Sequence, residues 1–277
     1  MNRETRAVHD IEQLKNADDP RLESYRNSRW NRQPDATTRD FIVEGRYCVE
    51  RLLQSDYDVQ SVLITEGKPF EILAHHDNVL PVYSLPPAEI RKLVGFDFHR
   101  GIMACAKRPA LRSMAAFERE HIGPEIMVAL LGLCERENVG SIMRTATALG
   151  VKRILLGPKT ADPFARRTVR VSMGTVFRLK LYDLSDPSSQ LADLAKRQDV
   201  HTIATTLDQT ATPLRDFRLR RQSVILIAGN EAEGIAEEIQ KVATDLVIIP
   251  MSQGTNSLNV AVASAICLHE LCNQLKH

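Results

Sequence analysis

The chain lacks the cysteine patterns that mark metal-binding and disulfide-stapled proteins. Its five cysteines are scattered over 277 residues, and none forms a Cys-x-x-Cys pair. Zinc sites and redox-active dithiols use such pairs, so the sequence predicts neither. The eight histidines form no ligand-spaced cluster with carboxylates. We therefore expect no metal, and a reducing compartment, the cytoplasm, as the location.

Long apolar runs and an excess of one charge are also missing. The N-terminal segment MNRETRAVHDIEQLK contains no apolar stretch of signal-peptide length. The run IMVALLGL, near residue 125, is far shorter than the roughly 20 residues of a membrane-spanning helix, so we expect no membrane association. With 36 basic and 35 acidic residues the net charge is +1, which favours neither an acidic nor a basic partner.

The composition, 43% hydrophobic and 26% charged, is that of an ordinary soluble protein with one large or two ordinary domains. The expected organisation is a polar, basic extension (1–38), an α/β domain (39–110), a linker (111–124) and a larger α/β domain (125–277). In the extension, Val8, Ile11 and Leu14 have helical spacing. Arginines interleaved with Tyr25 and Trp30 there suit either nucleic acid binding or docking of the aromatic rings on the protein itself.

Two alternating patterns predict the secondary structure of the domains. In the first, helices are expected at 41–53, 68–76 and 86–94, strands at 59–65, 78–84 and 101–108, and a short helix in the connection 109–124. In the second, strands are expected at 126–133, 153–157, 176–183, 201–207, 224–229 and 246–251, and helices at 139–149, 163–172, 188–198, 234–242 and 258–275. The continuous apolar strands of the second domain predict a parallel sheet covered on both faces.

Positive charge is concentrated in one part of this balanced chain. Between Arg144 and Lys180 there are nine basic residues and one acid, Asp162. Arg166, Arg167 and Arg170 have helical spacing, and guanidinium groups bind phosphate bidentately. The run predicts either an RNA-binding surface or an ordinary solvated face.

Two polar loops follow predicted strands of the second domain. The first, Glu137-Asn138-Val139-Gly140-Ser141-Ile142-Met143-Arg144, opens a helix with Asn138 as a possible cap. The second, Gly229-Asn230-Glu231-Ala232-Glu233-Gly234, has glycine at both ends and differs from the G-x-G-x-x-G dinucleotide fingerprint. Either loop alone is also compatible with an ordinary strand–helix junction.

The third loop, Ile249-Pro250-Met251 to Ser257-Leu258-Asn259-Val260, leads into the last helix. We expect Ser257 to cap this helix and Asn259 to stay free in its first turn. Capping does not explain why so many polar groups gather at the end of a strand, where open α/β sheets bind ligands.

Together the three loops resemble the motifs of the SpoU/TrmH family of RNA ribose 2′-O-methyltransferases: N-x-G-x-x-x-R-x-A, G-x-E-x-x-G, and I-P-M followed by S-L-N-V. The resemblance implies S-adenosylmethionine as methyl donor, a deep trefoil knot in the C-terminal domain, a homodimer, and rRNA or tRNA as substrate. It also implies that the domain at 39–110 is a ribosomal-protein-like RNA-binding domain. True knots are essentially absent among protein folds, so the expectation of a knot in the C-terminal domain comes from the family resemblance alone.

The resemblance also implies roles for individual residues. The residues that match its catalytic positions are Asn138, Arg144, Glu231, Ser257 and Asn259. Those that match its donor-binding positions are Gly229, Ile249 and Leu258, with Leu207 as a further candidate. Two positions depart from the family pattern: Ala232 stands where glycine is common, and Asn256 where glutamate is common.

Arg144 has two possible roles: the base that the family commonly assigns to this arginine, or a clamp for an RNA phosphate. The guanidinium pKa above about 12 opposes the first role.

Two other functions compete with the methyltransferase hypothesis. A catalytically silent RNA-binding scaffold is disfavoured because all five polar positions are present, and a nucleotide-dependent oxidoreductase because the glycine fingerprint is missing.

Overall fold

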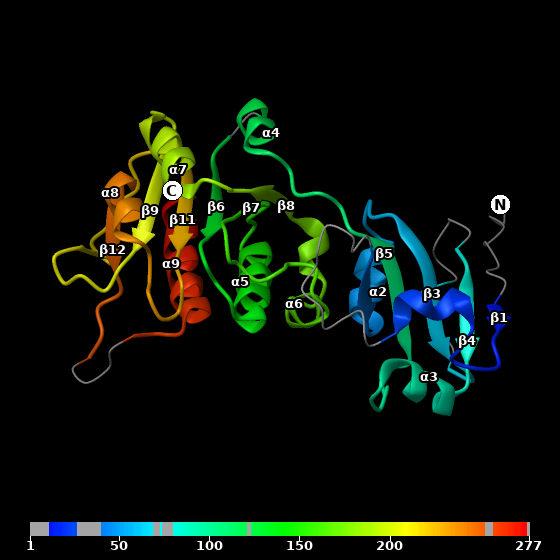
Figure 1. Ribbon diagram of the computed structural model, residues 1–277. Coiled ribbons are helices and arrows are strands. Elements are labelled where there is room, and N and C mark those ends of the chain that lie inside the picture. The colour runs from blue at the N-terminus through cyan, green and yellow to red at the C-terminus, as the bar shows by residue number, and fades with distance from the viewer. Residues whose placement is uncertain are drawn as a thin grey trace, which may run out of the picture. The chain divides into compact units, whose positions relative to one another are not determined.

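The computed structural model describes residues 11–26, 40–68, 73, 80–120, 123–252 and 257–275 (Figure 1). Contacts divide the chain into two compact units. Unit 1 comprises Met1–Pro109 and Phe164–Phe177, and unit 2 comprises Ala110–Pro163 and Arg178–His277. Most of the helix predicted at 68–76 lies outside the described residues, as do Val8 and Trp30.

Unit 1 is built on a mixed five-stranded sheet. The strand order is β1-β4-β3-β5-β2, in which β4 pairs in parallel with β1 and β3, and β5 pairs antiparallel with β3 and β2. Its elements are β1 (Ile11–Gln13), the 3₁₀ helix η1 (Pro20–Tyr25), β2 (Asp40–Glu44), α2 (Arg46–Leu53), β3 (Val59–Thr65), β4 (Val82–Leu85), α3 (Pro87–Val94), β5 (Ile102–Lys107) and α6 (Arg166–Val171). The strands predicted at 59–65 and 101–108 and the helix at 86–94 are thus confirmed. Of the strand predicted at 78–84, the last three residues form part of β4, and residues 78 and 79 lie outside the described residues.

Two helices predicted near the N-terminus are wrong in part. Residues 40–44 form strand β2, and the helix α2 begins only at Arg46, because Gly45 has a positive φ of 90° that breaks the run between them. Ile11–Gln13 forms β1 beside β4 instead of a helix. Pairing with the edge of β4 holds these residues in an extended conformation. The spacing of apolar residues near Ile11 does not reveal this partner.

Tyr25 is buried in unit 1, as one of the two interpretations of the extension expected. It is 1% exposed, packs in a core with Leu14, Leu22 and Ile42, and its hydroxyl lies 2.8 Å from the Ser61 hydroxyl. This ring therefore stabilises the unit and is not available to stack on a nucleic acid base.

The segment Phe164–Phe177 belongs to unit 1 through two sets of contacts. The rings of Phe164 and Phe177 lie 5.1 and 6.0 Å from that of Phe41, which is in β2. Arg166 and Arg170 of α6 form ion pairs of 3.0 and 3.2 Å with the Glu44 carboxylate, whose side chain is 3% exposed. Apolar packing and a buried carboxylate thus hold this segment against the first sheet.

Unit 2 is built on a seven-stranded, entirely parallel sheet, as the continuous apolar runs predicted. The order is β10-β12-β9-β11-β6-β7-β8. Its elements are α4 (Met114–Arg119), β6 (Glu125–Leu130), α5 (Arg136–Ala148), β7 (Arg153–Leu156), β8 (Lys180–Asp183), α7 (Pro187–Lys196), β9 (Val200–Thr205), β10 (Thr212–Pro213), β11 (Ser223–Ala228), α8 (Glu237–Val242), β12 (Asp245–Ile248) and α9 (Val260–Leu275). The strand predicted at 176–183 is shorter than expected, because Thr175–Arg178 forms the 3₁₀ helix η3.

Helices cover both faces of this sheet. Met127 and Ile225 pack in one core with Leu191 of α7 and Ile239 of α8. Successive side chains of a strand point to opposite faces, so α9, which packs against α5, β6 and β11, covers the other face. Among the described residues no helix is long and apolar enough to cross a membrane.

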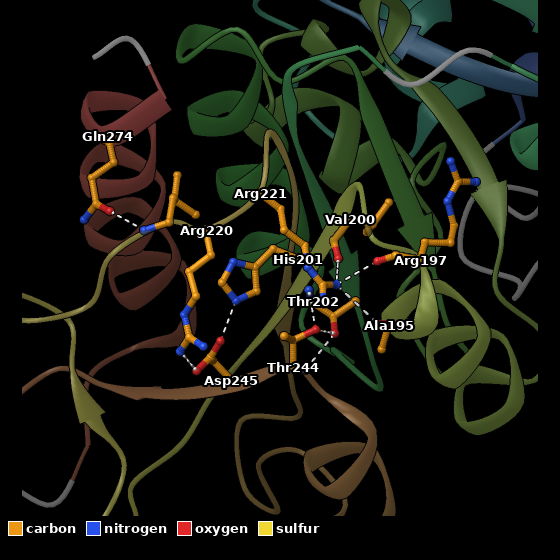
Figure 2. Close-up of polar contacts among 11 residues, drawn as sticks. Ala195, Arg197, Val200, His201, Thr202, Arg220, Arg221, Thr244, Asp245 and Gln274 are labelled. Atoms are coloured by element: carbon orange, nitrogen blue, oxygen red, sulfur yellow. Dashed lines mark hydrogen bonds and ion pairs between the residues drawn. The ribbon is translucent and has the colours of Figure 1, made fainter.

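The amino ends of the strands carry a polar cluster far from the loops discussed above (Figure 2). His201 of β9 is 1% exposed, and its Nε2 lies 2.5 Å from the Asp245 carboxylate at the start of β12. Arg220 donates to the same carboxylate at 3.0 Å. Arg221 donates to the carbonyl oxygens of Ala195, Arg197 and Val200. The cluster ties the connection before β11 to the neighbouring strands.

This cluster predicts a loss of stability in acid. Burial lowers the pKa of His201, although Asp245 opposes the shift. The unfolded chain, whose histidine has a pKa of about 6.5, therefore takes up the proton first as the pH falls. We therefore expect the free energy of unfolding to fall as the pH drops from about 7.5 to about 5.5, through the ordinary histidine pKa.

Urea denaturation at the two pH values measures this loss. His201→Gln keeps a donor for Asp245 but does not titrate, so its unfolding free energy should vary less with pH than that of the wild-type protein. An equal pH dependence in the two proteins would show that His201 is not the group responsible.

Candidate active site

Three loops meet at the carboxyl edge of the unit 2 sheet. They follow β6, β11 and β12, and because all three strands are parallel, their carboxyl ends lie on the same edge (Figure 1). These are the three loops in which the sequence analysis found its motifs. Residues 253–256 of the third loop lie outside the described residues.

Asn138 in the first turn of α5, Glu231 in the second loop and Asn259 at the end of the third form a chain of hydrogen bonds. Asn138 is not the cap of α5, because the helix begins earlier, after Glu135. Asn259 Nδ2 donates to Asn138 Oδ1 at 2.9 Å, and Asn138 Nδ2 donates to Glu231 Oε1 at 2.9 Å. Asn138 lies 121 residues before Asn259 and 93 residues before Glu231. The structure therefore brings together three of the five residues matched to catalytic positions.

The orientation of this chain is set by the last helix. Asn259 Oδ1 accepts from the backbone N–H groups of Ala261 and Val262, at 2.9 and 3.3 Å, and so caps α9. Its Nδ2 must then point to Asn138, whose own Nδ2 is left to meet the carboxylate of Glu231. The expectation that Ser257 caps this helix and leaves Asn259 free is wrong; Ser257 is exposed on the rim of a cavity.

The second loop is held in a tight turn by Asn230, which the sequence analysis did not single out. Asn230 Oδ1 accepts from the N–H groups of Ala232 and Glu233, and its Nδ2 donates to the carbonyl of Gly132 at 2.7 Å. The backbones of Asn230 and Gly234 also exchange two hydrogen bonds of 2.9 Å. Asparagine is a common turn residue because its side chain forms hydrogen bonds with nearby backbone groups. This preference was the feature of the sequence that could have indicated the role of Asn230.

Gly229, at the start of this turn, has no room for a side chain. A Cβ atom there would lie 2.4 Å from the carbonyl oxygen of Gly234 and 2.5 Å from Cγ1 of Ile235. The close approach of two backbone segments thus requires glycine at this position. The closed turn borders an open space.

That space is a cavity of about 540 Å³. Its wall is formed by the loop after β9, the second loop and the third loop. The residues matched to donor binding all line it: Leu207, Gly229, Ile249 and Leu258. Glu231, Ser257 and Asn259 line it as well, so the hydrogen-bonded chain lies at its edge. Its size suits a ligand of a few hundred daltons.

Arg144 lies on α5, outside this group. It is exposed and has no ion pair or hydrogen bond with the described residues, and it does not line the cavity. It lies six positions after Asn138 on this helix, about 9 Å along the axis and about 120° around it. Within the described residues, the structure therefore does not join its guanidinium to the hydrogen-bonded chain.

The three arginines matched to RNA binding are arranged differently from one another. Arg166 and Arg170 are partly buried and paired with Glu44, and burial lowers the pKa of Arg166. The ring of Phe96 lies 4.5 Å from the guanidinium carbon of Arg166. Arg167 is exposed. Two of the three thus hold α6 in unit 1, and their role toward RNA stays a prediction.

Within the described residues no three histidine, cysteine, aspartate or glutamate side chains are grouped to hold a metal ion. The expectation of a metal-free protein stays a prediction.

Comparisons with known proteins agree with these motifs. The sequence matches the SpoU rRNA Methylase family over residues 125–269. An uncharacterized tRNA/rRNA methyltransferase of Mycobacterium bovis is 31% identical, over 94% of this chain and 91% of its own. RlmP of Bacillus subtilis, a 23S rRNA (guanosine(2553)-2′-O)-methyltransferase, is 29% identical over 84% of this chain and 89% of its own.

A solved structure supports the fold along almost the whole chain. An rRNA methyltransferase from Sinorhizobium meliloti, crystallised with AdoMet bound, has a TM-score of 0.79 at 23% identity, over 96% of this chain and 98% of its own. Because the family match covers more than half of the chain and the mycobacterial relative is similar almost from end to end, the chain belongs to the SpoU/TrmH family of RNA methyltransferases.

Proposed function

We propose that the protein transfers a methyl group from S-adenosylmethionine to a ribose 2′-hydroxyl of structured rRNA or tRNA. The observation that carries this proposal is the hydrogen-bonded chain of Asn259, Asn138 and Glu231 at the edge of the cavity. The activity of the relative RlmP, a 2′-O-methyltransferase, supports the position of transfer.

The cavity fits the methyl donor. Apolar side chains of Ile249 and Leu258 and the close-packed backbone at Gly229 offer flat surfaces for an adenosine group. When bound, S-adenosylmethionine supplies an electrophilic methyl group on a sulfonium. AdoMet in the Sinorhizobium meliloti relative supports this choice of donor.

We infer that the chain's own residues align the ribose and handle its proton. Arg144 binds an RNA phosphate and orients the neighbouring hydroxyl, since a guanidinium group holds its proton too strongly to serve as a base. The hydroxyl proton leaves late in the attack or through that phosphate. Asn138 and Asn259 keep the loops aligned, Glu231 fixes Asn138, and Ser257 on the rim contacts the ribose.

Unit 1 is proposed to bind the RNA. Tyr47, at the start of α2, is 63% exposed and follows the exposed Arg46. Exposed aromatic rings next to arginines suit stacking on unpaired bases and contact with phosphates. Arg166, Arg167 and Arg170 are proposed to add phosphate contacts from the same unit.

We further propose the homodimer and the trefoil knot that the family resemblance implies, and action in the cytoplasm, where these RNAs are found. Val262 and Ile266, one turn apart on α9, are 50% and 40% exposed, which supports a self-contact along this helix. The return of the chain through α9 to the central strands β6 and β11 is compatible with a knot.

A methylation assay tests the proposal. The purified protein is incubated with S-adenosylmethionine labelled in the methyl group and with total rRNA or tRNA that lacks the modification. Label should enter RNA and protect one phosphodiester bond from alkaline hydrolysis, because that cleavage needs the free 2′-hydroxyl. Label on an alkali-sensitive nucleotide would overturn ribose methylation. Failure to bind the donor, measured by calorimetry, would favour the catalytically silent scaffold.

A further inference from the structure

All ionisable side chains among the described residues that line the cavity are acidic. Its ionisable lining residues are three carboxylates, Asp208, Glu231 and Glu233, and none of its described lining residues is lysine, arginine or histidine. Residues 253–256, Gln-Gly-Thr-Asn, carry no charge in the sequence either. A cavity lined in this way attracts a cation.

Hydrogen bonds position the carboxylates of Asp208 and Glu231 and the backbone of Glu233. Asp208 Oδ1 accepts from both the backbone N–H and the hydroxyl of Thr210, each at 2.8 Å. These bonds lower the pKa of Asp208, so it is ionised at neutral pH. Glu231 accepts from Asn138, and the N–H of Glu233 donates to Asn230. The negative charge is therefore built into the turns that form the wall.

Methyl transfer changes the charge of the ligand in such a cavity. In the reaction the bond between sulfur and the methyl carbon breaks and a bond between that carbon and the ribose oxygen forms. The sulfonium becomes a neutral thioether, and the hydroxyl proton is released to water. The amino acid and adenosine groups are common to donor and product, so their charges cancel when the two affinities are compared.

We propose that Asp208, with Glu231 and Glu233, makes this cavity select the cationic sulfonium donor over the neutral thioether product. Asp208 is the specificity-determining residue, because it serves neither the hydrogen-bonded chain nor the turn of the second loop. The inference rests on the proposed function, since it takes S-adenosylmethionine as the donor. Its consequence is that the product is released more easily than the donor once the charge is lost.

Calorimetry with S-adenosylmethionine and S-adenosylhomocysteine tests the proposal on the full chain. The measured quantity is the ratio of the product Kd to the donor Kd. In Asp208→Asn this ratio should fall about threefold, and in Asp208→Asn combined with Glu233→Gln about tenfold. High salt should lower the ratio of the wild-type protein in the same direction.

Asp199→Asn is the matched control. Asp199 is another exposed carboxylate of unit 2, but it precedes β9, whereas Asp208 follows it, about 20 Å away along the strand. Its ratio should equal that of the wild-type protein. The amide introduced by Asp208→Asn retains an acceptor oxygen for Thr210, so an unchanged product Kd in this variant demonstrates an intact cavity.

A ratio that is the same in the wild-type protein and the Asp208 and Glu233 variants, and insensitive to salt, would overturn the charge selection. A fall in the ratio that comes from weaker donor binding alone is the expected result. If the wild-type protein binds neither compound, the proposed donor is wrong, which is distinguishable from failure of this inference.

Discussion

Arg144→Ala should lower the rate of RNA methylation by at least about 100-fold while leaving donor affinity within about twofold of the wild-type value. The side chain is exposed, lies outside the cavity and is not bonded to the described residues. Its loss therefore removes no hydrogen bond or ion pair with them, and alanine is well tolerated on an exposed helix. The function that we expect Arg144→Ala to lose is the alignment of the ribose beside its phosphate.

Single-turnover methylation and calorimetry with S-adenosylmethionine separate the two effects. Arg144→Lys keeps the charge but not the bidentate geometry, so it should recover only part of the rate. Arg215→Ala, which removes an exposed arginine elsewhere in unit 2, is the control and should methylate normally. Near-normal turnover of Arg144→Ala on its true RNA would refute the assignment.

Gly229→Ala should weaken donor binding more than about 30-fold. A Cβ atom would come within 2.4 Å of the Gly234 carbonyl oxygen, and the hydrogen bonds between Asn230 and Gly234 leave that backbone little freedom to move. The turn must therefore open, which displaces both Glu231 and the wall of the cavity. Overpacking of this kind costs typically about 1–3 kcal/mol of stability, so the melting temperature should fall as well.

Calorimetry and thermal melting of two glycine variants separate this clash from a general effect of alanine. Gly123 has no atom within 4 Å of the position of a Cβ and no positive φ, so Gly123→Ala should behave like the wild-type protein. Ala232→Gly, in the same turn as Gly229, should also bind the donor normally. Donor affinity of Gly229→Ala within about threefold of the wild-type value would mean that the turn adapts and that the close packing is not required.

The parallel sheet of unit 2 was predictable because burial on both faces leaves a direct trace in the sequence. Runs such as Val224–Ala228 are apolar at every position, and every one of these residues is buried. The short pair Thr212–Pro213 in β10 was missed, because two residues at the sheet edge show no periodicity. The segment Phe41–Val43 is apolar for the same reason as the strands, yet it was predicted to continue into the helix after Gly45.

The site was predictable in its residues but not in its bonding. The resemblance to the family motifs implied that Asn138, Glu231 and Asn259 belong to one site, and the structure joins them. Two features depend on the directions of side-chain amides, which no spacing encodes: the capping of α9 by Asn259 instead of Ser257, and the part of Asn230 in closing the turn. The positive run at Arg166–Arg170 was interpreted as an open surface because its partner, Glu44, is more than 100 residues away.

The sequence by itself determined the family, the parallel α/β sheet and the identity of the polar residues in three loops, because motifs and buried runs are properties of neighbouring residues. Only the tertiary structure decided that the first part of the chain forms a mixed sheet, that Phe164–Phe177 packs on it, and that the charged groups in the described cavity wall are all carboxylates. Each of these results depends on contacts between residues far apart in the chain, and the free energy of such contacts exists only once the chain is folded.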